Sequence, residues 1–330
     1  MNNTTLKLLA QQLQLSISTV SRALKNHPDI SAKTKAKVQA LAQNLDYEPN
    51  ASAIQLRTQT SKILGVIVPA IANLFYENFL AAIEEESRNN GYALMILQSN
   101  HNAENELNNL KIFRQNRVSG IFACLSANSE NLDVYHKMIE QDMPIVFFDI
   151  VPKSNAFTKV RMADERCGVL AAKNIIKRNA KKVLAIFGDP ALSISQIRKT
   201  SFQNLMMDLS PKTNVKYINA TSSIEAEEIF KKNYNKTAKL DTVFCMTDEI
   251  LIGVMRAIQE LQIKVPTEMG VISISNGFIP NLYFPVISYV ETSGFQLGKL
   301  AFVQMMANMQ TGKPVDELTV EAKLIEGGSM

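Results

Sequence analysis

The feature that most constrains the fold is a regular alternation of short apolar runs with amphipathic stretches, which begins after Lys62. Short apolar runs are typical of buried strands, and each stretch between them is long enough for one helix. Strands are expected at 63–68, 93–97, 119–125, 144–149, 183–188, 215–219, 241–247 and 271–275. Helices are expected at 73–90, 103–115, 131–141 and 193–209, and from positions 164, 223 and 248. This alternation predicts an α/β fold with parallel sheets, and the strands are too many for one compact sheet, so we expect two similar lobes.

The first fifty residues follow a different pattern, which predicts three short helices. A hydroxyl side chain that can accept a helix-start N–H precedes each one, at Thr4 or Thr5, at Ser16 and at Ser31. Apolar residues recur at helical spacing behind each cap and predict a small separate core. The expected core residues are Leu6, Leu9, Ala10, Leu13, Val20, Ala23, Leu24, Val38, Leu41, Ala42 and Leu45.

The second of these helices has the surface of a DNA-reading helix. Its outward positions carry Ile17, Ser18, Ser21 and Arg22, so small and polar groups surround one long cation. The outward lysines of the third helix are Lys33, Lys35 and Lys37. Two helices joined by a short turn, the second with exposed hydroxyls and an arginine, suit entry into a major groove.

Charge is concentrated at the same end of the chain. Residues 1–62 contain eight Lys and Arg residues and three acidic residues, a surplus of five, whereas the whole chain has a formal net charge of +4. An ordinary helical bundle with a solvated basic face is the alternative. A polyanion-binding head on a nearly neutral body accounts better for the asymmetry.

The chain also carries several short motifs in a specific combination. They are LQLSISTVSR at 13–22, DYEPN at 46–50, Ala53 with Leu56-Arg57, LGVIVP at 64–69, and Val265-Pro266. This combination resembles the lactose-repressor (LacI/GalR) family of bacterial transcription regulators over essentially the whole chain. One departure is Gln14, where the family has Gly at a turn that needs a left-handed backbone, which Gly adopts at lower cost.

The resemblance implies a domain organisation. It places a helix-turn-helix DNA-binding domain at 1–49, a hinge helix and linker at 50–61, and a two-lobed periplasmic-binding-protein-like body at 62–330. The first lobe is expected at about 62–150 and 288–312, and the second at about 160–280 and 318–330. The chain would cross between lobes near 150–161, 276–289 and 312–318, with the helix 295–309 in the first lobe and the segment 318–325 in the second.

The resemblance also implies which residues contact DNA. Arg22 and the region of Ser18 would read base edges, and Leu56 would wedge into the minor groove, unless it packs the hinge against the body. Thr19, Ser21, Ser31 and Thr34 would hold phosphates. The remaining expected contacts are Thr5, Ser16, Ile17, Asn26, Asn50 and Ala53.

An effector is expected between the lobes, at the carboxyl ends of both sheets. The implied residues are Phe75, Tyr76, Cys124, Asp149, Arg198, Thr247 and Ser275. Phe75 and Tyr76 are either core aromatics or a stacking wall for a ring. Asp149 is either a cap for the following loop or an acceptor for ligand hydroxyls. Arg198 would bind vicinal hydroxyls or a carboxylate through its planar donors.

Three departures from the family pattern reduce the charge of this expected pocket. Ile150 stands where the family often has Arg, Thr247 stands where Asn usually precedes an Asp, and Ser275 stands where Asp usually ends the strand. The pattern therefore leaves the identity of the effector open.

Composition excludes several other classes of function. The three cysteines are far apart in apolar segments, and the three histidines form no cluster, so we expect buried thiols in a reducing cytoplasm, no metal site and no cofactor. No phosphate loop, nucleophile elbow or acid–base pair is visible, so an enzyme is not expected. A sugar-transport binding protein would need an export signal where this chain has a helix-turn-helix.

The sequence therefore predicts a cytoplasmic, homodimeric transcription regulator, more in keeping with a repressor than an activator. Its expected partners are double-stranded operator DNA and a small effector such as a sugar or related metabolite. No apolar run approaches the length of a membrane-spanning helix, so no membrane partner is expected.

Overall fold

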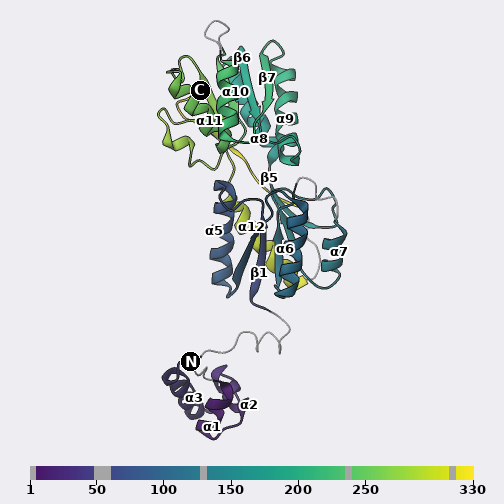
Figure 1. Cartoon of the computed structure of the whole chain (residues 1–330), viewed down its shortest axis with the longest axis vertical. Coiled ribbons are helices and arrows are strands. Elements are labelled where there is room, and N and C mark those ends of the chain that lie inside the picture. The colour runs from purple at the N-terminus through teal and green to yellow at the C-terminus, as the bar shows by residue number, and fades with distance from the viewer. Residues whose placement is uncertain (1–4, 48–60, 127–131, 235–239, 312–316) are drawn as a thin grey trace. The chain divides into compact units, whose positions relative to one another are not determined.

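A computed structural model describes residues 5–47, 61–126, 132–234, 240–311 and 317–330. The chain divides into two compact units, Met1–Ser61 and Lys62–Met330, here called the head and the body (Figure 1).

The head contains three helices, α1 (Leu6–Leu13), α2 (Ile17–Leu24) and α3 (Ala32–Asn44). Thr5, Ser16 and Ser31 cap them, and each side chain accepts one helix-start N–H, as predicted. The apolar residues also pack as predicted. The fully buried ones are Leu9, Ala10, Val20, Ala23, Val38 and Ala42, and Leu6, Leu13, Leu24, Leu41 and Leu45 pack around them. Gln14 has the expected left-handed backbone, with a φ of 52°.

The first lobe of the body is built on a six-stranded sheet in the order β11-β5-β4-β3-β1-β2, with parallel pairing throughout. The strands are β1 (Ile63–Val68), β2 (Ala93–Gln98), β3 (Gly120–Ala123), β4 (Ile145–Phe148), β5 (Thr158–Met162) and β11 (Leu318–Val320). The helices are α5 (Leu74–Asn89), α6 (Ala103–Gln115), α7 (Asp133–Ile139) and α12 (Gly294–Thr311). Helix α12 packs along α5, so the late helix does return to the first lobe.

The second lobe is built on a six-stranded sheet in the order β12-β10-β9-β8-β6-β7. Its strands are β6 (Lys182–Phe187), β7 (Asn214–Asn219), β8 (Thr242–Cys245), β9 (Gly270–Ser275), β10 (Ser288–Glu291) and β12 (Lys323–Ile325). Its helices are α8 (Asp164–Lys177), α9 (Ser193–Leu209), α10 (Ser223–Asn233), α11 (Asp248–Glu260) and the short η1 (Pro280–Leu282). Among the described pairs of strands, only β10 and β12 run antiparallel.

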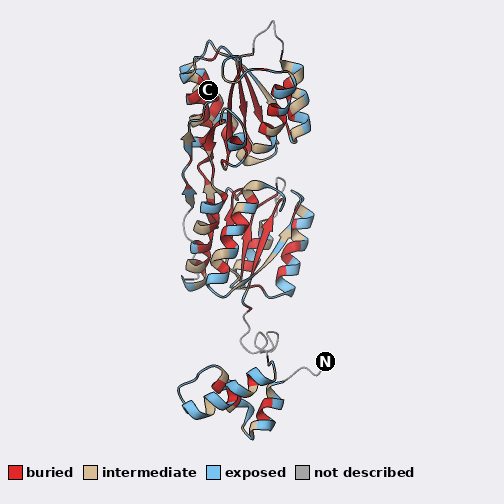
Figure 2. Cartoon of the chain, turned by 90° about the vertical axis from the view of Figure 1, so that its left-hand side faces the viewer, coloured by how far each residue is buried: buried red, intermediate tan, exposed pale blue. Residues whose placement is uncertain are grey.

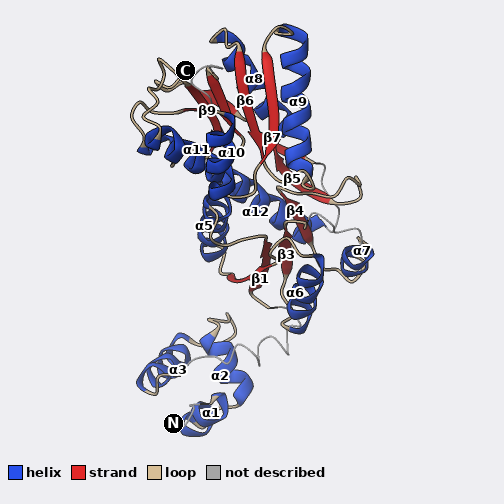
Figure 3. Ribbon diagram, turned by 45° about the horizontal axis from the view of Figure 1, so that its top comes forward, coloured by secondary structure: helices blue, strands red, loops and turns tan. Residues whose placement is uncertain are grey.

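The α/β fold with two mostly parallel sheets is confirmed, and helices flank the strands of both sheets (Figure 3). Buried residues concentrate in the strands and on the inner helix faces (Figure 2). Each lobe has its own apolar core.

Three short strands differ from the expected assignment to lobes. β10 was expected in the first lobe but joins the second sheet beside β9, whereas β11 was expected in the second lobe but pairs with β5 of the first sheet. β5 also belongs to the first sheet, although the second lobe was expected to begin near position 160. These strands are the segments that pass between the lobes, and their residue pattern does not specify which sheet supplies the hydrogen-bonding edge.

Candidate functional sites in the head and between the lobes

The predicted DNA-reading residues of α2 lie mostly on its accessible face. Ile17 keeps 48% of its surface exposed, and Ser18 and Arg22 are also exposed. Thr19 and Ser21 are partly buried. The structure therefore presents an apolar group, a hydroxyl and a guanidinium together on one helix.

Several of the predicted phosphate-binding hydroxyls take part in helix capping. The Ser16 hydroxyl accepts the Thr19 N–H at 3.0 Å and lies 2.8 Å from the hydroxyls of both Ser18 and Thr19. The Ser31 hydroxyl accepts the Thr34 N–H at 3.2 Å, and their hydroxyl oxygens are 2.9 Å apart. Capping fixes these side chains at the helix starts, where exposed N–H groups also favour an anion.

The remaining predicted DNA contacts lie in two places. Asn26 is exposed in the loop between α2 and α3. Asn50, Ala53 and Leu56 lie outside the described residues. The sequence pattern gave no indication of Asp29, whose carboxylate faces Arg22 and His27.

In the first lobe, three of the predicted effector residues come together at the carboxyl ends of β1, β3 and β4. The Tyr76 hydroxyl donates to Asp149 Oδ2 at 2.8 Å and lies 3.6 Å from Cys124 Sγ. The Phe75 ring meets the Tyr76 ring edge-on, with centroids 5.6 Å apart. The ring of Tyr76 is buried in the first core, while its hydroxyl is engaged by Asp149.

Asp149 is an unusual carboxylate for the end of an apolar strand. It is almost fully buried, and its φ of 59° is left-handed, which turns the chain sharply after β4. Burial raises its pKa from 3.8 to about 6, and the neighbouring Asp164 carboxylate also acts to raise it, while the Tyr76 hydrogen bond and Arg198 act in the opposite direction. A carboxylate kept in this setting is a strong acceptor for a hydroxyl or N–H donor.

In the second lobe, Arg198 is held by a partner that the sequence pattern did not identify. Its Nε donates to Asp164 Oδ1 at 2.8 Å, and both side chains are buried. Asp164 is the first residue of α8 and Arg198 lies on α9, so the pair joins two helices that pack closely. Asp149 of the first lobe is within electrostatic reach of both groups. Tyr76, Asp149, Asp164 and Arg198 are called the interlobe cluster below.

The other two predicted residues, Thr247 and Ser275, lie beside a second carboxylate, Asp248, which is the Asp that follows Thr247 in the family pattern. The Thr247 side chain caps α11 by accepting the Ile250 N–H at 3.3 Å. Ser275 is buried at the end of β9 and bonds to Asp248, while burial raises the pKa of Asp248 to about 6. The Asp248 Oδ1 atom is buried without a hydrogen-bond partner.

The two lobes also touch beside these residues. The Asn276 amide donates to the Leu74 carbonyl at 3.4 Å, which links the end of β9 to the start of α5. The Leu74 side chain packs against the second core, and Leu192 and Ile194 pack against the first. The predicted effector residues therefore lie where the carboxyl ends of the two sheets approach each other.

Two negative findings limit the chemistry of these regions. Among the described residues there is no group of three or more His, Cys, Asp or Glu side chains arranged to hold a metal ion. No helix in the described ranges is long and apolar enough to cross a membrane.

Comparison with known proteins finds a match for the head and another for the later part of the body. Residues 5–50 match the family of bacterial regulatory proteins known as the lacI family, and residues 172–330 match a periplasmic binding protein-like domain. The chain is 26% identical over 306 residues to the HTH-type transcriptional repressor PurR of Vibrio atlanticus (strain LGP32), covering 90% of each protein.

Solved structures share the fold over nearly the full length. The lac repressor dimer bound to operator and the anti-inducer ONPF is similar with a TM-score of 0.90 and 18% identity, covering 99% of each chain. A complex of the transcriptional regulator CelR with cellobiose is similar with a TM-score of 0.68 and 17% identity, covering 99% of this chain and 100% of the other. The relatives are named as regulators and not as enzymes. A lacI-type head joined to a periplasmic-binding-protein-like body makes this chain a transcriptional regulator of the lacI family.

Proposed function

We propose that the protein is a repressor that binds a two-fold symmetric operator as a homodimer and responds to a small effector bound between the lobes of its body. The effector is a polyhydroxylated molecule, such as a sugar or a related metabolite. Its binding changes the affinity of the heads for DNA, a coupling typically worth about 1–3 kcal/mol.

The observation that carries the effector proposal is the interlobe cluster. It brings a buried carboxylate, Asp149, and a buried guanidinium, Arg198, from opposite lobes within electrostatic reach of each other. Buried polar groups are normally hydrogen-bonded, yet Ser126 Oγ after β3, Ser195 Oγ in the first turn of α9 and Asp248 Oδ1 at the start of α11 are buried without partners. Each hydroxyl of a polyhydroxylated ligand can both donate and accept a hydrogen bond. Such a ligand would donate to the carboxylates and serine oxygens and accept from the guanidinium.

The solved relatives support this class of ligand. The similar structures contain the anti-inducer ONPF in the lac repressor and cellobiose in CelR. In the present chain, the partly buried Phe75 would pack against a ring, the Tyr76 hydroxyl would help to orient Asp149, and Asp149 and Arg198 would bind the hydroxyls of the ligand.

For DNA, we propose that α2 enters the major groove. Ile17 would contact a thymine methyl, and Ser18 and Arg22 would read base edges. Thr5, Ser16, Thr19, Ser21, Asn26, Ser31 and Thr34 would face the backbone near the helix starts and the loop. The roles of Asn50, Ala53 and Leu56 in the minor groove remain predictions.

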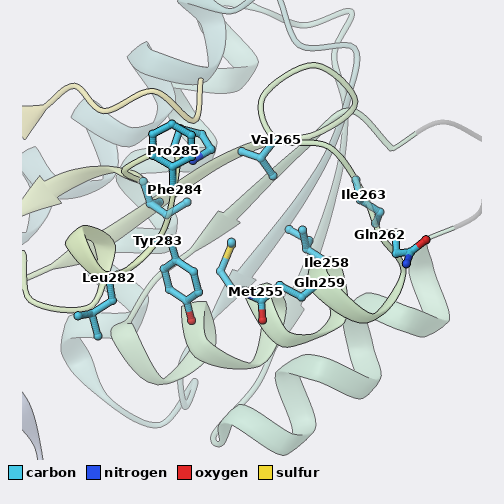
Figure 4. A pocket seen from close by; sticks show the side chains of 11 residues that line it. Met255, Ile258, Gln259, Gln262, Ile263, Val265, Leu282, Tyr283, Phe284 and Pro285 are labelled. Atoms are coloured by element: carbon cyan, nitrogen blue, oxygen red, sulfur yellow. The ribbon is translucent and has the colours of Figure 1, made fainter.

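A surface of the second lobe supports the proposed dimer. A groove of about 210 Å³ lies between α11 and the segment that follows η1, with Met255 and Ile258 on the helix side (Figure 4). Phe284 lines this groove and is fully exposed, and Leu282 beside it is 65% exposed. An exposed side chain and a groove on the same surface allow an isologous contact about a two-fold axis, in which Phe284 of each copy would pack into the groove of the other.

The interlobe proposal is tested with the purified full-length protein by thermal shift against neutral mono- and disaccharides and free nucleobases. A ligand that raises the melting temperature of the body should lose most of its affinity with Arg198→Lys, because Lys keeps the charge but lacks the planar donors. Lys199→Arg, on the next position of α9, is the matched control and should bind normally. A ligand that binds wild type and Arg198→Lys equally would refute this location of the effector site.

A further inference from the structure

The loop between α2 and α3 has a defined conformation, which fixes where Asp29 lies. Asn26 follows the end of α2 with a left-handed φ of 57°. The His27 N–H donates to the Arg22 carbonyl at 3.0 Å, and the Ile30 N–H donates to the His27 carbonyl at 3.2 Å. Lys35 of α3 donates to the Asn26 carbonyl at 3.2 Å. Ile30 packs against the core of the head, so the residue before it is anchored on both sides.

Arg22 and His27 both lie beside the Asp29 carboxylate, and the His27 Nδ1 atom accepts the Asp29 N–H at 3.3 Å. The Asp29 Oδ2 atom lies 3.9 Å from Arg22 Nη1 and 3.3 Å from His27 Nδ1. The side chains of Arg22 and Asp29 are 59% and 63% exposed, so both remain available to a bound duplex. An exposed pair of this kind adds little to the stability of the fold.

We propose that Asp29 is a positioning residue that sets the base discrimination of the head. The carboxylate orients the Arg22 guanidinium from one side and leaves its other N–H donors directed outward. A guanidinium held in one orientation loses less conformational freedom when it forms two hydrogen bonds to the edge of a guanine. The proposal rests on the DNA-reading role of α2.

The same carboxylate must weaken binding to DNA of any sequence. It brings a negative charge close to the phosphates and partly neutralises the guanidinium that α2 presents to DNA. Asp29 should therefore lower affinity for random DNA while it raises the preference for the correct base pair. This pair of opposite effects separates positioning from a structural role, because loss of a structural residue would lower both affinities together.

The experiment uses the full-length protein. Its operator is first selected from a pool of random duplexes, and the base pair read by Arg22 is identified as the position where Arg22→Ala loses preference. We expect Asp29→Asn to reduce discrimination at this base pair by about tenfold and to tighten binding to random DNA several-fold. Asp29→Glu should restore part of the discrimination.

Asp46→Asn is the matched control, because Asp46 is another exposed acid of the head, has a left-handed φ of 49°, and lies beyond the far end of α3. It removes the same charge and should tighten random binding slightly without changing any base preference. If Asp29→Asn behaves in the same way, Asp29 acts only as a charge and the positioning proposal is overturned.

Each of three outcomes of the selection experiment would also overturn the proposal. A loss of preference at a different base pair would mean that Asp29 contacts a base itself, for example the amino group of a cytosine. Failure of the wild-type protein to select any motif would remove the proposed DNA-reading role of α2 and the Asp29 proposal with it. A selected motif with unchanged discrimination in Asp29→Asn would contradict the Asp29 proposal alone.

Discussion

Asp149 carries the charge of the interlobe cluster that is most sensitive to pH. Its pKa rises from 3.8 to about 6 on folding, chiefly because burial disfavours the ionised form. Below about pH 3 the carboxyl group is largely neutral in both the folded and the unfolded chain, so its burial carries no cost of burying a charge. As pH rises through about 6 the folded protein must carry a buried charge, and the stability present at low pH is lost.

Asp149→Asn should therefore become more stable than wild type as pH rises. The side chain stays neutral, can accept from Tyr76, and tolerates the left-handed backbone. Its advantage in free energy of unfolding should grow by about 2 kcal/mol between pH 4 and pH 7.5. The measurement is thermal or urea unfolding of the body at both pH values.

Asp142→Asn provides the control, because Asp142 is an exposed residue of the same lobe with a φ of 60°. Its effect on stability should be small and independent of pH. An advantage for Asp149→Asn that is the same at both pH values would show that Asp149 does not ionise as a buried group.

At the same scale, the sequence identified single residues better than it identified their partners. Asp149 stands out because a carboxylate ends an apolar run, and Arg198 because it lies early in a helix motif of the family. Asp164 does not stand out, although it holds Arg198 at 2.8 Å, because the two are 34 positions apart. Such a pairing depends on how α8 packs on α9, which side-chain periodicity does not reveal.

At the scale of elements, Gly168 explains how α8 and α9 come so close. A Cβ atom added at Gly168 would lie 2.3 Å from the Arg198 carbonyl oxygen and 2.2 Å from the Ser201 hydroxyl. Carbon cannot approach a backbone oxygen so closely, so any side chain at this position must push the helices apart. The close contact is also what brings Asp164 within reach of Arg198.

Gly168→Ala should therefore destabilise the body by about 1–3 kcal/mol, as overpacking of an interior commonly does. It should also weaken effector binding, because the displaced α9 carries Arg198. Unfolding of the body and ligand titration measure the two effects. Lys173→Ala, on the exposed side of α8, should change neither by more than about 0.5 kcal/mol. Wild-type stability in Gly168→Ala would mean that the helices move apart at no cost.

Helices and strands were not equally predictable. The helix beginnings at Ser16, Ser31, Asn73 and Thr247 follow from side chains that accept helix-start N–H groups, a local interaction. The long central strands follow from their apolar runs. The short strands β10 and β11 could not be assigned to the correct sheet, because that assignment depends on distant pairing with β9 and β5.

For the whole molecule, the charge asymmetry of the sequence indicated a separate head, and the structure does divide the chain at Ser61. The assembly of two chains was expected only from the family resemblance. The proposed dimer is supported by the exposed side chain of Phe284. Phe284 follows η1 in an irregular segment without periodicity, so the sequence pattern could not predict that this side chain is exposed.

Phe284→Asp should convert the protein from dimer to monomer at micromolar concentration. Burying one phenylalanine side chain contributes about 1.5–3 kcal/mol, and a two-fold interface loses two of them, besides placing a carboxylate in each groove. The dissociation constant of the dimer should therefore rise by at least about a hundredfold, as measured by sedimentation equilibrium. The monomer should keep its effector affinity and lose most of its affinity for a two-half-site operator.

Met207→Asp is the matched control, since Met207 is 69% exposed on α9 and does not line the groove. It introduces the same charge on another exposed apolar residue and should leave the assembly unchanged. If Phe284→Asp remains dimeric while effector binding is intact, the two copies meet through another face of the body. In that case the two-fold dimer that binds the symmetric operator forms through a surface that does not include Phe284, and the groove beside α11 is not part of the dimer interface.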